Sequence, residues 1–240
     1  MRKTILTHFY NEEYLLPWWL EHHKNLFDWG VCINYGSTDR SVEIIKDICP
    51  KWQVVDSINE NFDARLCDEE VIKYEKQIPG WKITLNVTEF LVGDFTILNN
   101  VPGQEFKIPC HVMVDKEEDT IVLKEHSLWK IKPFGIPYNS NTPKLRRPRC
   151  IHNKEWVRYP LGRHYEEHDQ EALQVLWYGW SPFNKKLLQR KLQIQQRIPE
   201  TDKAQGYGRE HIVTEESLIR QFDELKLKAI DLSPVLKIIQ

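Results

Sequence analysis

Two short apolar runs near the start of the chain, each ending in a polar turn, constrain the fold more than any other feature of the sequence. The first run occupies residues 4–9 and is followed by Asn11 and Glu12. The second occupies residues 31–35 and is followed by residues 36–39, Gly-Ser-Thr-Asp. A helical pattern follows each turn, and this alternation is typical of parallel strands joined by helices. Because ligands of open α/β sheets bind at the carboxyl ends of the strands, the two turns are expected to hold the functional site.

The first helical pattern has a recognisable start and an apolar face. Pro17 suits the first turn of a helix, where the N–H that proline lacks is unpaired in any case. Trp19 and His23 then fall on the same face at helical spacing. Neighbouring residues on a helix point about 100° apart, so His22 and His23 cannot chelate a metal ion together. Both histidines are therefore interpreted as structural.

The remaining apolar patterns predict further strands and helices. Strands are expected over residues 52–56, 81–85, 95–98, 108–115, 120–123 and 173–180, the middle ones with a more antiparallel character. Helices are expected over residues 41–48 and 63–77, from Ser181-Pro182 to about Arg197, and after the capping residue Thr214, with Ile219 on the inner face. Residues 199–208 are predicted to form a polar, glycine-bearing loop that could act as a lid.

These patterns predict an α/β protein with a mostly parallel, Rossmann-type nucleotide-binding sheet. A length of 240 residues fits a single domain. Within it, residues 1–92 are expected to form the nucleotide-binding half and residues 93–180 an irregular α+β half for a second substrate. Residues 181–240 are expected to form C-terminal helices.

Composition excludes several function classes. A formal net charge of −2 argues against a general nucleic-acid binder. The five cysteines are scattered and include no C-x-x-C pair, so they are expected to be reduced, buried thiols. No charged-then-apolar leader and no membrane-length apolar run stands out, which predicts a cytoplasmic protein. A peripheral contact with a membrane stays open.

The motifs at the strand ends resemble a known family. The run Phe-Tyr-Asn-Glu-Glu at residues 9–13, Leu-Pro-Trp-Trp-Leu-Glu-His-His at 16–23 and Gly-Ser-Thr-Asp-Arg-Ser at 36–41 resemble the opening of family-2-like glycosyltransferases of the GT-A fold. The resemblance is nearest to the branch similar to family 92. It implies transfer of a sugar from a nucleotide-diphosphate donor, favouring a UDP-linked one, to a hydroxyl of a glycan, lipid-linked or protein acceptor. By analogy with the family, inversion is favoured over retention.

The resemblance also implies which residues hold the donor. Carboxylates at the first two turns suit uracil N–H and ribose hydroxyl groups, because they accept charge-assisted hydrogen bonds. A third set of polar residues follows the strand at 81–85, and Arg163 is a candidate cation for the diphosphate. The expected donor-binding residues are Phe9, Asn11, Glu12, Ser37, Asp39, Asn86, Thr88 and Arg163.

The third turn departs from the family pattern. The family usually has Asp-x-Asp there to hold a divalent cation, whereas this chain has Asn86-Val87-Thr88-Glu89. Mn²⁺ or Mg²⁺ prefers carboxylate oxygens, so Glu89, with Asp94 or with a later histidine such as His164, is one way to keep a metal. Cationic side chains are a second way to neutralise the diphosphate: Arg163, Lys185, Arg190 and residues 144–149. Binding without turnover is the third alternative.

Transfer with inversion needs a base beside the acceptor hydroxyl. The carboxylates in the second half of the chain are Asp115, Glu125, Glu166, Glu167 and Asp169, and of these Asp115 and Glu166 are chosen as candidate catalytic residues. A nucleotidyltransferase is a weaker alternative, because no glycine-rich phosphate loop is present near the start of the chain. A non-catalytic module that binds nucleotide sugars or carbohydrates remains the alternative from another class.

Overall fold

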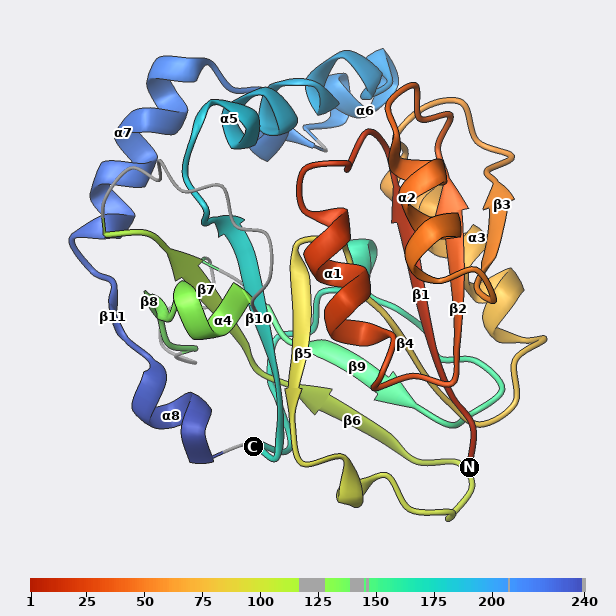
Figure 1. The fold of residues 1–240 in the computed structure, drawn as a ribbon. Coiled ribbons are helices and arrows are strands. Elements are labelled where there is room, and N and C mark those ends of the chain that lie inside the picture. The colour runs from red at the N-terminus through yellow and green to blue at the C-terminus, as the bar shows by residue number, and fades with distance from the viewer. Residues whose placement is uncertain (117–127, 139–144, 146, 207, 239–240) are drawn as a thin grey trace.

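The computed structural model describes residues 1–240 except 117–127, 139–144, 146, 207 and 239–240. Figure 1 shows two β-sheets with helices packed around them. The strands are β1 Lys3–Phe9, β2 Trp29–Asn34, β3 Gln53–Asp56, β4 Trp81–Thr84, β5 Glu89–Gly93, β6 Glu105–Ile108, β7 Cys110–Val114, β8 Phe134–Ile136, β9 Arg149–His152, β10 Leu173–Trp180 and β11 Ile230–Asp231. The helices are α1 Leu16–His23, α2 Ser41–Ile48, α3 Ala64–Glu75, α4 Leu128–Ile131, α5 Lys185–Leu192, α6 Glu200–Gln205, α7 Glu215–Lys226 and α8 Ser233–Ile238, with 3₁₀ turns η1 Phe95–Ile97, η2 Leu161–Arg163, η3 Ile194–Arg197 and η4 Arg209–His211.

The first sheet has the strand order β3-β2-β1-β4-β9-β6. Strands β1 to β4 are parallel, and β9 is antiparallel to both β4 and β6. The carboxyl ends of β1, β2 and β3 therefore share one edge, toward which their arrows point at the top of Figure 1. The α/β class and the parallel start of the chain are confirmed.

The chain reverses its direction of travel across this sheet at β1. From β1 it moves outward through β2 to β3, and it then returns to place β4 on the other side of β1. Such a topological switch point opens a crevice at the carboxyl ends of the two central strands. The ligand site expected from topology is thus the edge where β1 and β4 end.

The second sheet has the strand order β11-β8-β7-β10-β5. Only β7 and β10 pair in parallel among its described strands, and the other pairs are antiparallel. Strand β5 lies in this sheet although it belongs to the expected nucleotide-binding half, and β9 from the second half lies in the first sheet. The expected division at residues 92 and 93 therefore does not coincide with the division between the sheets.

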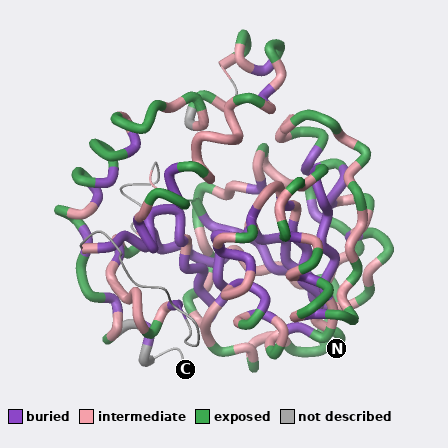
Figure 2. Tube along the Cα trace, turned by 45° about the horizontal axis from the view of Figure 1, so that its top comes forward, coloured by how far each residue is buried: buried purple, intermediate pink, exposed green. Residues whose placement is uncertain are grey.

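Helix α1 is fixed between the sheets by its apolar face. Trp19 is fully buried, and its indole Nε1 donates to the Glu89 carbonyl at 2.9 Å. His23 is also fully buried; Nε2 accepts from the Leu91 N–H at 3.2 Å, so Nδ1 donates to the Trp19 carbonyl at 2.8 Å. Burial lowers the pKa of His23, which keeps the ring neutral. Figure 2 shows the buried chain concentrated along the strands in the middle of the molecule. The structural interpretation of His23 is confirmed.

Three local predictions are wrong. Residues 95–97 form a 3₁₀ turn instead of a strand, because the Asp94 carboxylate accepts from the Thr96 N–H at 2.8 Å. The helix expected from Ser181 begins at Lys185 and is capped by Asn184. The expected lid loop contains helix α6.

The exposure of one side chain contradicts a further expectation, and two other predictions fall outside the described residues. Ile219 is 41% exposed, so it does not belong to the inner face of α7. The strand expected at residues 120–123 and the candidate base Glu125 lie outside the described residues.

All five cysteines are buried thiols outside disulfide bonds. Burial raises the pKa of Cys49 and of Cys67 to about 11, and that of Cys150 to about 12, so these thiols stay protonated. Among the described helices, none combines the length and the apolar character needed to cross a bilayer.

Candidate functional site

The turns after β1 and β2 are joined into one unit by Asn11. Its side-chain Oδ1 accepts from the Thr38 N–H at 2.8 Å and from the Asp39 N–H at 3.3 Å. Its own N–H donates to Ser37 Oγ at 3.1 Å. Asn11 has a φ of 49°, in the left-handed region that asparagine tolerates better than most residues. The two turns therefore form a single polar surface at the carboxyl ends of neighbouring strands.

Asp39 ties the same unit to the start of α2 and to the segment before α1. One carboxylate oxygen accepts from the Ser41 N–H and the other from the Glu13 N–H, each at 3.0 Å. A carboxylate has about four acceptor positions, so both oxygens can accept further hydrogen bonds. Asn11, Ser37 and Asp39 are all partly exposed. They are the predicted donor-binding residues that the structure brings together with a face toward solvent.

Phe9 and Glu12 lie at the same edge but point elsewhere. The Phe9 ring is 2% exposed and belongs to the core. The Glu12 carboxylate is 9% exposed and is bound through both oxygens by the Arg190 guanidinium from α5. Glu12 therefore anchors a C-terminal helix to the β1 turn, and the side chain of Phe9 supports the turn from below.

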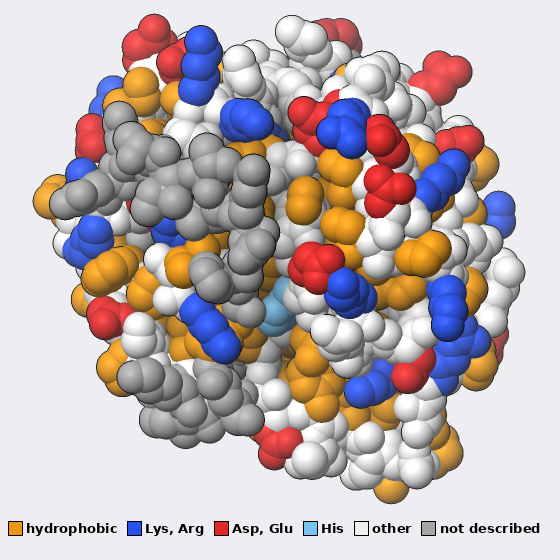
Figure 3. All heavy atoms as spheres, in the orientation of Figure 1, with side chains coloured by type: hydrophobic (Ala, Val, Ile, Leu, Met, Phe, Trp, Pro, Cys, Tyr) orange, Lys and Arg blue, Asp and Glu red, His pale blue; other side chains and the backbone are white. Residues whose placement is uncertain are grey.

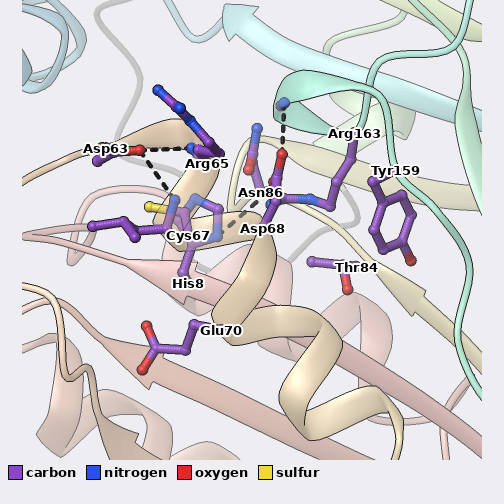
Figure 4. Close-up of polar contacts among 12 residues, drawn as sticks. His8, Asp63, Arg65, Cys67, Asp68, Glu70, Thr84, Asn86, Tyr159 and Arg163 are labelled. Atoms are coloured by element: carbon purple, nitrogen blue, oxygen red, sulfur yellow. Dashed lines mark hydrogen bonds and ion pairs between the residues drawn. The ribbon is translucent and has the colours of Figure 1, made fainter. Parts of the chain in front are cut away.

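A second polar group lies at the switch point between β1 and β4. Figure 4 shows His8 from β1, Asp68 from α3, Asn86 after β4 and Arg163 from η2 lying close together. The Arg163 guanidinium forms an ion pair with Asp68, and its Nη2 lies 3.4 Å from His8 Nδ1. Because a guanidinium only donates, His8 Nδ1 accepts and the ring proton resides on Nε2.

The charges around His8 keep its ring neutral. Burial and the nearby guanidinium groups of Arg163 and Arg149 lower the pKa of His8 to about 3. At neutral pH the ring can therefore present Nε2–H as a donor without carrying charge. The switch point combines this neutral donor with a partly exposed Asn86 amide.

The turn after β4 is closed by a buried ion pair. Arg149 Nε and Nη2 lie 2.9 and 2.6 Å from Glu89 Oε1, and Glu89 Oε2 accepts from the Asn86 N–H at 2.8 Å. The side chains of Arg149 and Glu89 are 1% and 0% exposed. The Thr88 hydroxyl accepts from Trp177 Nε1 at 3.1 Å and is likewise buried. Thr88 and Glu89 thus hold the turn together from inside.

The candidate metal ligands already make contacts within the protein. Glu89 already neutralises Arg149, Asp94 caps η1, and His164 follows η2 as a partly buried side chain. Within the described part of the chain, no group of three or more His, Cys, Asp or Glu side chains is placed to hold a metal ion.

The two candidate catalytic carboxylates lie in different environments. Asp115 is 4% exposed, accepts from Ser181 Oγ at 2.5 Å and the Phe183 N–H at 2.7 Å, and lies 3.5 Å from Lys132 Nζ. This carboxylate fixes the segment before α5. Glu166 is exposed and pairs with Arg147 at 2.6 Å. Of the two, Glu166 is the one that an acceptor could reach.

The structure adds site residues that the sequence did not indicate. Tyr10 follows β1 directly and is partly exposed, and His8 and Asp68 line the switch point. His8 falls within an apolar strand, and Asp68 falls among the charges of α3, so neither stands out from its neighbours in the sequence. Glu12 and Arg190 are 178 residues apart, and no local pattern predicts their pairing.

Comparisons with known proteins find only weak structural similarity. No family model matches the chain, and no curated protein matches it. Among solved structures, residues 1–349 of S. aureus TarS match with a TM-score of 0.34 and 13% identity over 64% of this chain and 47% of that one. The same protein in complex with UDP-GlcNAc matches with a TM-score of 0.35 and 14% identity over 64% and 45%. This chain spans less than half the length of these structures, and a likeness of this size carries no argument.

Proposed function

We propose that this chain binds a nucleotide-diphosphate sugar and transfers the sugar to an acceptor hydroxyl. The observation that carries the proposal is the single polar surface formed by the turns after β1 and β2, next to the β1–β4 switch point. Ligands of open α/β sheets bind at such a crevice. The motifs at these turns resemble those of family-2-like glycosyltransferases, which use nucleotide sugars.

The nucleoside is assigned to the first two turns. Asn11, Ser37 and Asp39 offer amide, hydroxyl and carboxylate groups that suit the hydroxyls of a ribose and the edge of a base. Tyr10 offers an aromatic face on which a base can stack. Glu12 acts indirectly in this assignment, because Arg190 already binds both of its oxygens.

The diphosphate is assigned to the switch point. His8 Nε2–H and the Asn86 amide are donors there. Among the described residues Arg163 keeps one N–H, at Nε, without a hydrogen-bond partner. Preorganised donors of this kind stabilise the charge that develops on a leaving diphosphate. This arrangement favours cationic and neutral donors over a metal ion as the means of neutralisation.

Of the two candidate carboxylates, Glu166 is proposed as the base that takes the acceptor proton. Its carboxylate is exposed, whereas Asp115 is occupied by Ser181 and the Phe183 N–H. In an inverting reaction the base removes the proton as the hydroxyl oxygen attacks the anomeric carbon, and the nucleoside diphosphate departs from the opposite face.

Calorimetric titration with UDP, GDP, TDP and CDP tests the proposal. Each nucleotide is added in EDTA and again with millimolar Mn²⁺. Binding of one nucleotide with equal affinity in both buffers is the expected result. Strengthening by Mn²⁺ would show that a metal site exists despite the Glu89–Arg149 pair. Failure of all four nucleotides to bind would remove the basis of the proposal.

A non-catalytic binding module is the second candidate function. It is favoured by the engagement of Glu12, Glu89 and Asp115 in contacts within the protein. Incubation with the sugar donor of the nucleotide that binds separates the two candidates. Slow release of the free nucleoside diphosphate indicates an enzyme, because glycosyltransferase sites also transfer to water, whereas an intact donor after prolonged incubation indicates a binding module.

A further inference from the structure

A late segment of the chain lies over the turns that the proposed function assigns to the nucleoside. In Figure 1, α5 and α6 lie at the top of the view, on the side toward which β1 and β2 point. Residues 184–197, which comprise the cap of α5, α5 itself and η3, are called the latch below. Its side chains Arg190, Gln193 and Arg197 all contact the turns after the parallel strands.

The first two contacts hold the latch to the β1 turn. Arg190 binds both carboxylate oxygens of Glu12, with the two side chains only 12% and 9% exposed. Gln193 Nε2 lies 3.3 Å from the carbonyl oxygens of Tyr10 and Asn11. These groups lie in the turn after β1, so the latch and a ligand of the turns share the same surface.

The third contact resembles the binding of a base. The guanidinium carbon of Arg197 lies 4.0 Å from the centroid of the Tyr10 ring, over its face. Its Nη1 and Nη2 donate to the carbonyl oxygens of Tyr35 and Glu60, each at 2.6 Å. A planar group over the face of an aromatic ring, with N–H groups on its edge donating to carbonyls, makes interactions of the kind that a bound nucleobase makes.

We propose that Arg197 occupies the site of the nucleobase, called the seat below, in this state of the protein. The latch then has to release Arg197 before a nucleoside diphosphate binds. The inference rests on the proposed function, since the turns after β1 and β2 define the seat. The Arg190–Glu12 pair sets the position of the latch, and Arg197 is the group that competes with the ligand. The contact is therefore autoinhibitory.

Competition of this kind has a measurable size. When only a fraction of the protein has an open seat, the observed dissociation constant equals the intrinsic constant divided by that fraction. A latch that is closed nine-tenths of the time weakens binding about tenfold. Removing the Arg197 side chain is therefore expected to tighten nucleotide binding by about this factor.

The experiment compares three proteins by calorimetry with GDP and UDP as probes. Guanine carries the same N–C–N donor edge as a guanidinium, so GDP matches Arg197 most closely and UDP is the comparison. The proteins are the wild type, Arg197→Ala and the control Arg220→Ala, which changes an exposed arginine on α7. Binding about tenfold tighter for Arg197→Ala, with Arg220→Ala unchanged, is the expected result.

Amide hydrogen exchange on the wild type is a second measurement that needs no variant. Saturation with the nucleotide is expected to speed exchange in residues 185–197, because the latch leaves the turns. Slower exchange there overturns the proposal. So does weaker nucleotide binding by Arg197→Ala, which would make Arg197 a ligand contact and leave the proposed function intact. Failure of the wild type and of Arg197→Ala to bind either nucleotide overturns both.

Discussion

Arg149 places two guanidinium nitrogens on one carboxylate oxygen of Glu89, at 2.9 and 2.6 Å, where neither side chain is reached by solvent. The pair lies at the turn after β4, where Glu89 was a candidate metal ligand on the basis of the sequence. Here the carboxylate is compensated by a cation from β9, 60 residues further along the chain. An internal ion pair therefore stabilises the turn.

Removal of one partner of this pair is expected to destabilise the protein. Arg149→Met leaves the Glu89 carboxylate buried without its cation and should lower the free energy of unfolding by about 3–5 kcal/mol. Urea unfolding measures the change. Arg147→Met is the matched control, because Arg147 forms an exposed pair with Glu166 and should change stability by at most about 1 kcal/mol. Equal, small effects of both substitutions would contradict the role assigned to the buried pair.

Asn11 is expected to act on both stability and nucleotide binding. Asn11→Gly keeps the positive φ but loses the hydrogen bonds from the Thr38 and Asp39 N–H groups and the amide offered to the nucleoside. At roughly 1 kcal/mol for the one lost ligand contact, nucleotide affinity should fall about fivefold. Asn11→Ala adds the backbone strain of a φ of 49° and should be less stable than Asn11→Gly by about 1 kcal/mol. Calorimetry and urea unfolding provide the two readouts. Unchanged affinity in both variants would separate Asn11 from the ligand site.

His8 is expected to make stability depend on pH. Its pKa is about 3 in the folded protein and about 6.5 in the unfolded chain, so only the unfolded chain gains a proton between these values. The contribution of His8 is therefore fully present above pH 6.5 and declines as pH falls toward 3. Between pH 7.5 and pH 5, the free energy of unfolding of the wild type should fall by about 1–2 kcal/mol more than that of His8→Asn, as measured by urea unfolding. Other histidines contribute equally to both proteins, and identical pH profiles would contradict the lowered pKa.

Asp115 and Glu166 are expected to differ in what their loss affects. Asp115→Asn weakens the contacts with Ser181 and the Phe183 N–H and should lower stability by about 1–3 kcal/mol, with turnover per folded molecule nearly unchanged. Glu166→Gln should leave stability within about 0.5 kcal/mol and reduce turnover by about 10²-fold or more if it is the base. Urea unfolding and release of the nucleoside diphosphate measure the two effects. The reverse result would exchange the roles of the two carboxylates.

The first part of the fold could be predicted from local patterns. Residues 3–9, 29–34 and 81–84 form strands where short apolar runs meet polar turns, and Pro17 marks the first turn of α1. These signals are local, since they depend on propensity and on side-chain periodicity within a few residues. The placement of Asn11, Ser37 and Asp39 at one edge follows from parallel pairing and could be predicted as well.

The rest depends on contacts between distant residues. Glu12 and Glu89 have the sequence context of ligand-binding carboxylates, but Arg190 and Arg149 bind them from later elements. Ser181 looked like a helix cap, but its hydroxyl donates to Asp115 instead. A buried charge is stable only when it is paired, and the partner is defined by the fold and not by the neighbouring sequence.

Strand β5 lies in the second sheet and β9 in the first, and this arrangement affects the order in which the chain can fold during synthesis. As the polypeptide leaves the ribosome, β4 remains an open edge until β9 arrives, about 65 residues later. During the same interval β5 has no partner, because β10 is synthesised later still. A fragment that ends at residue 92 would therefore expose two unpaired strands and should associate with itself. The first sheet can be completed only after β9 has been made, and the second only after β11 follows at residues 230–231.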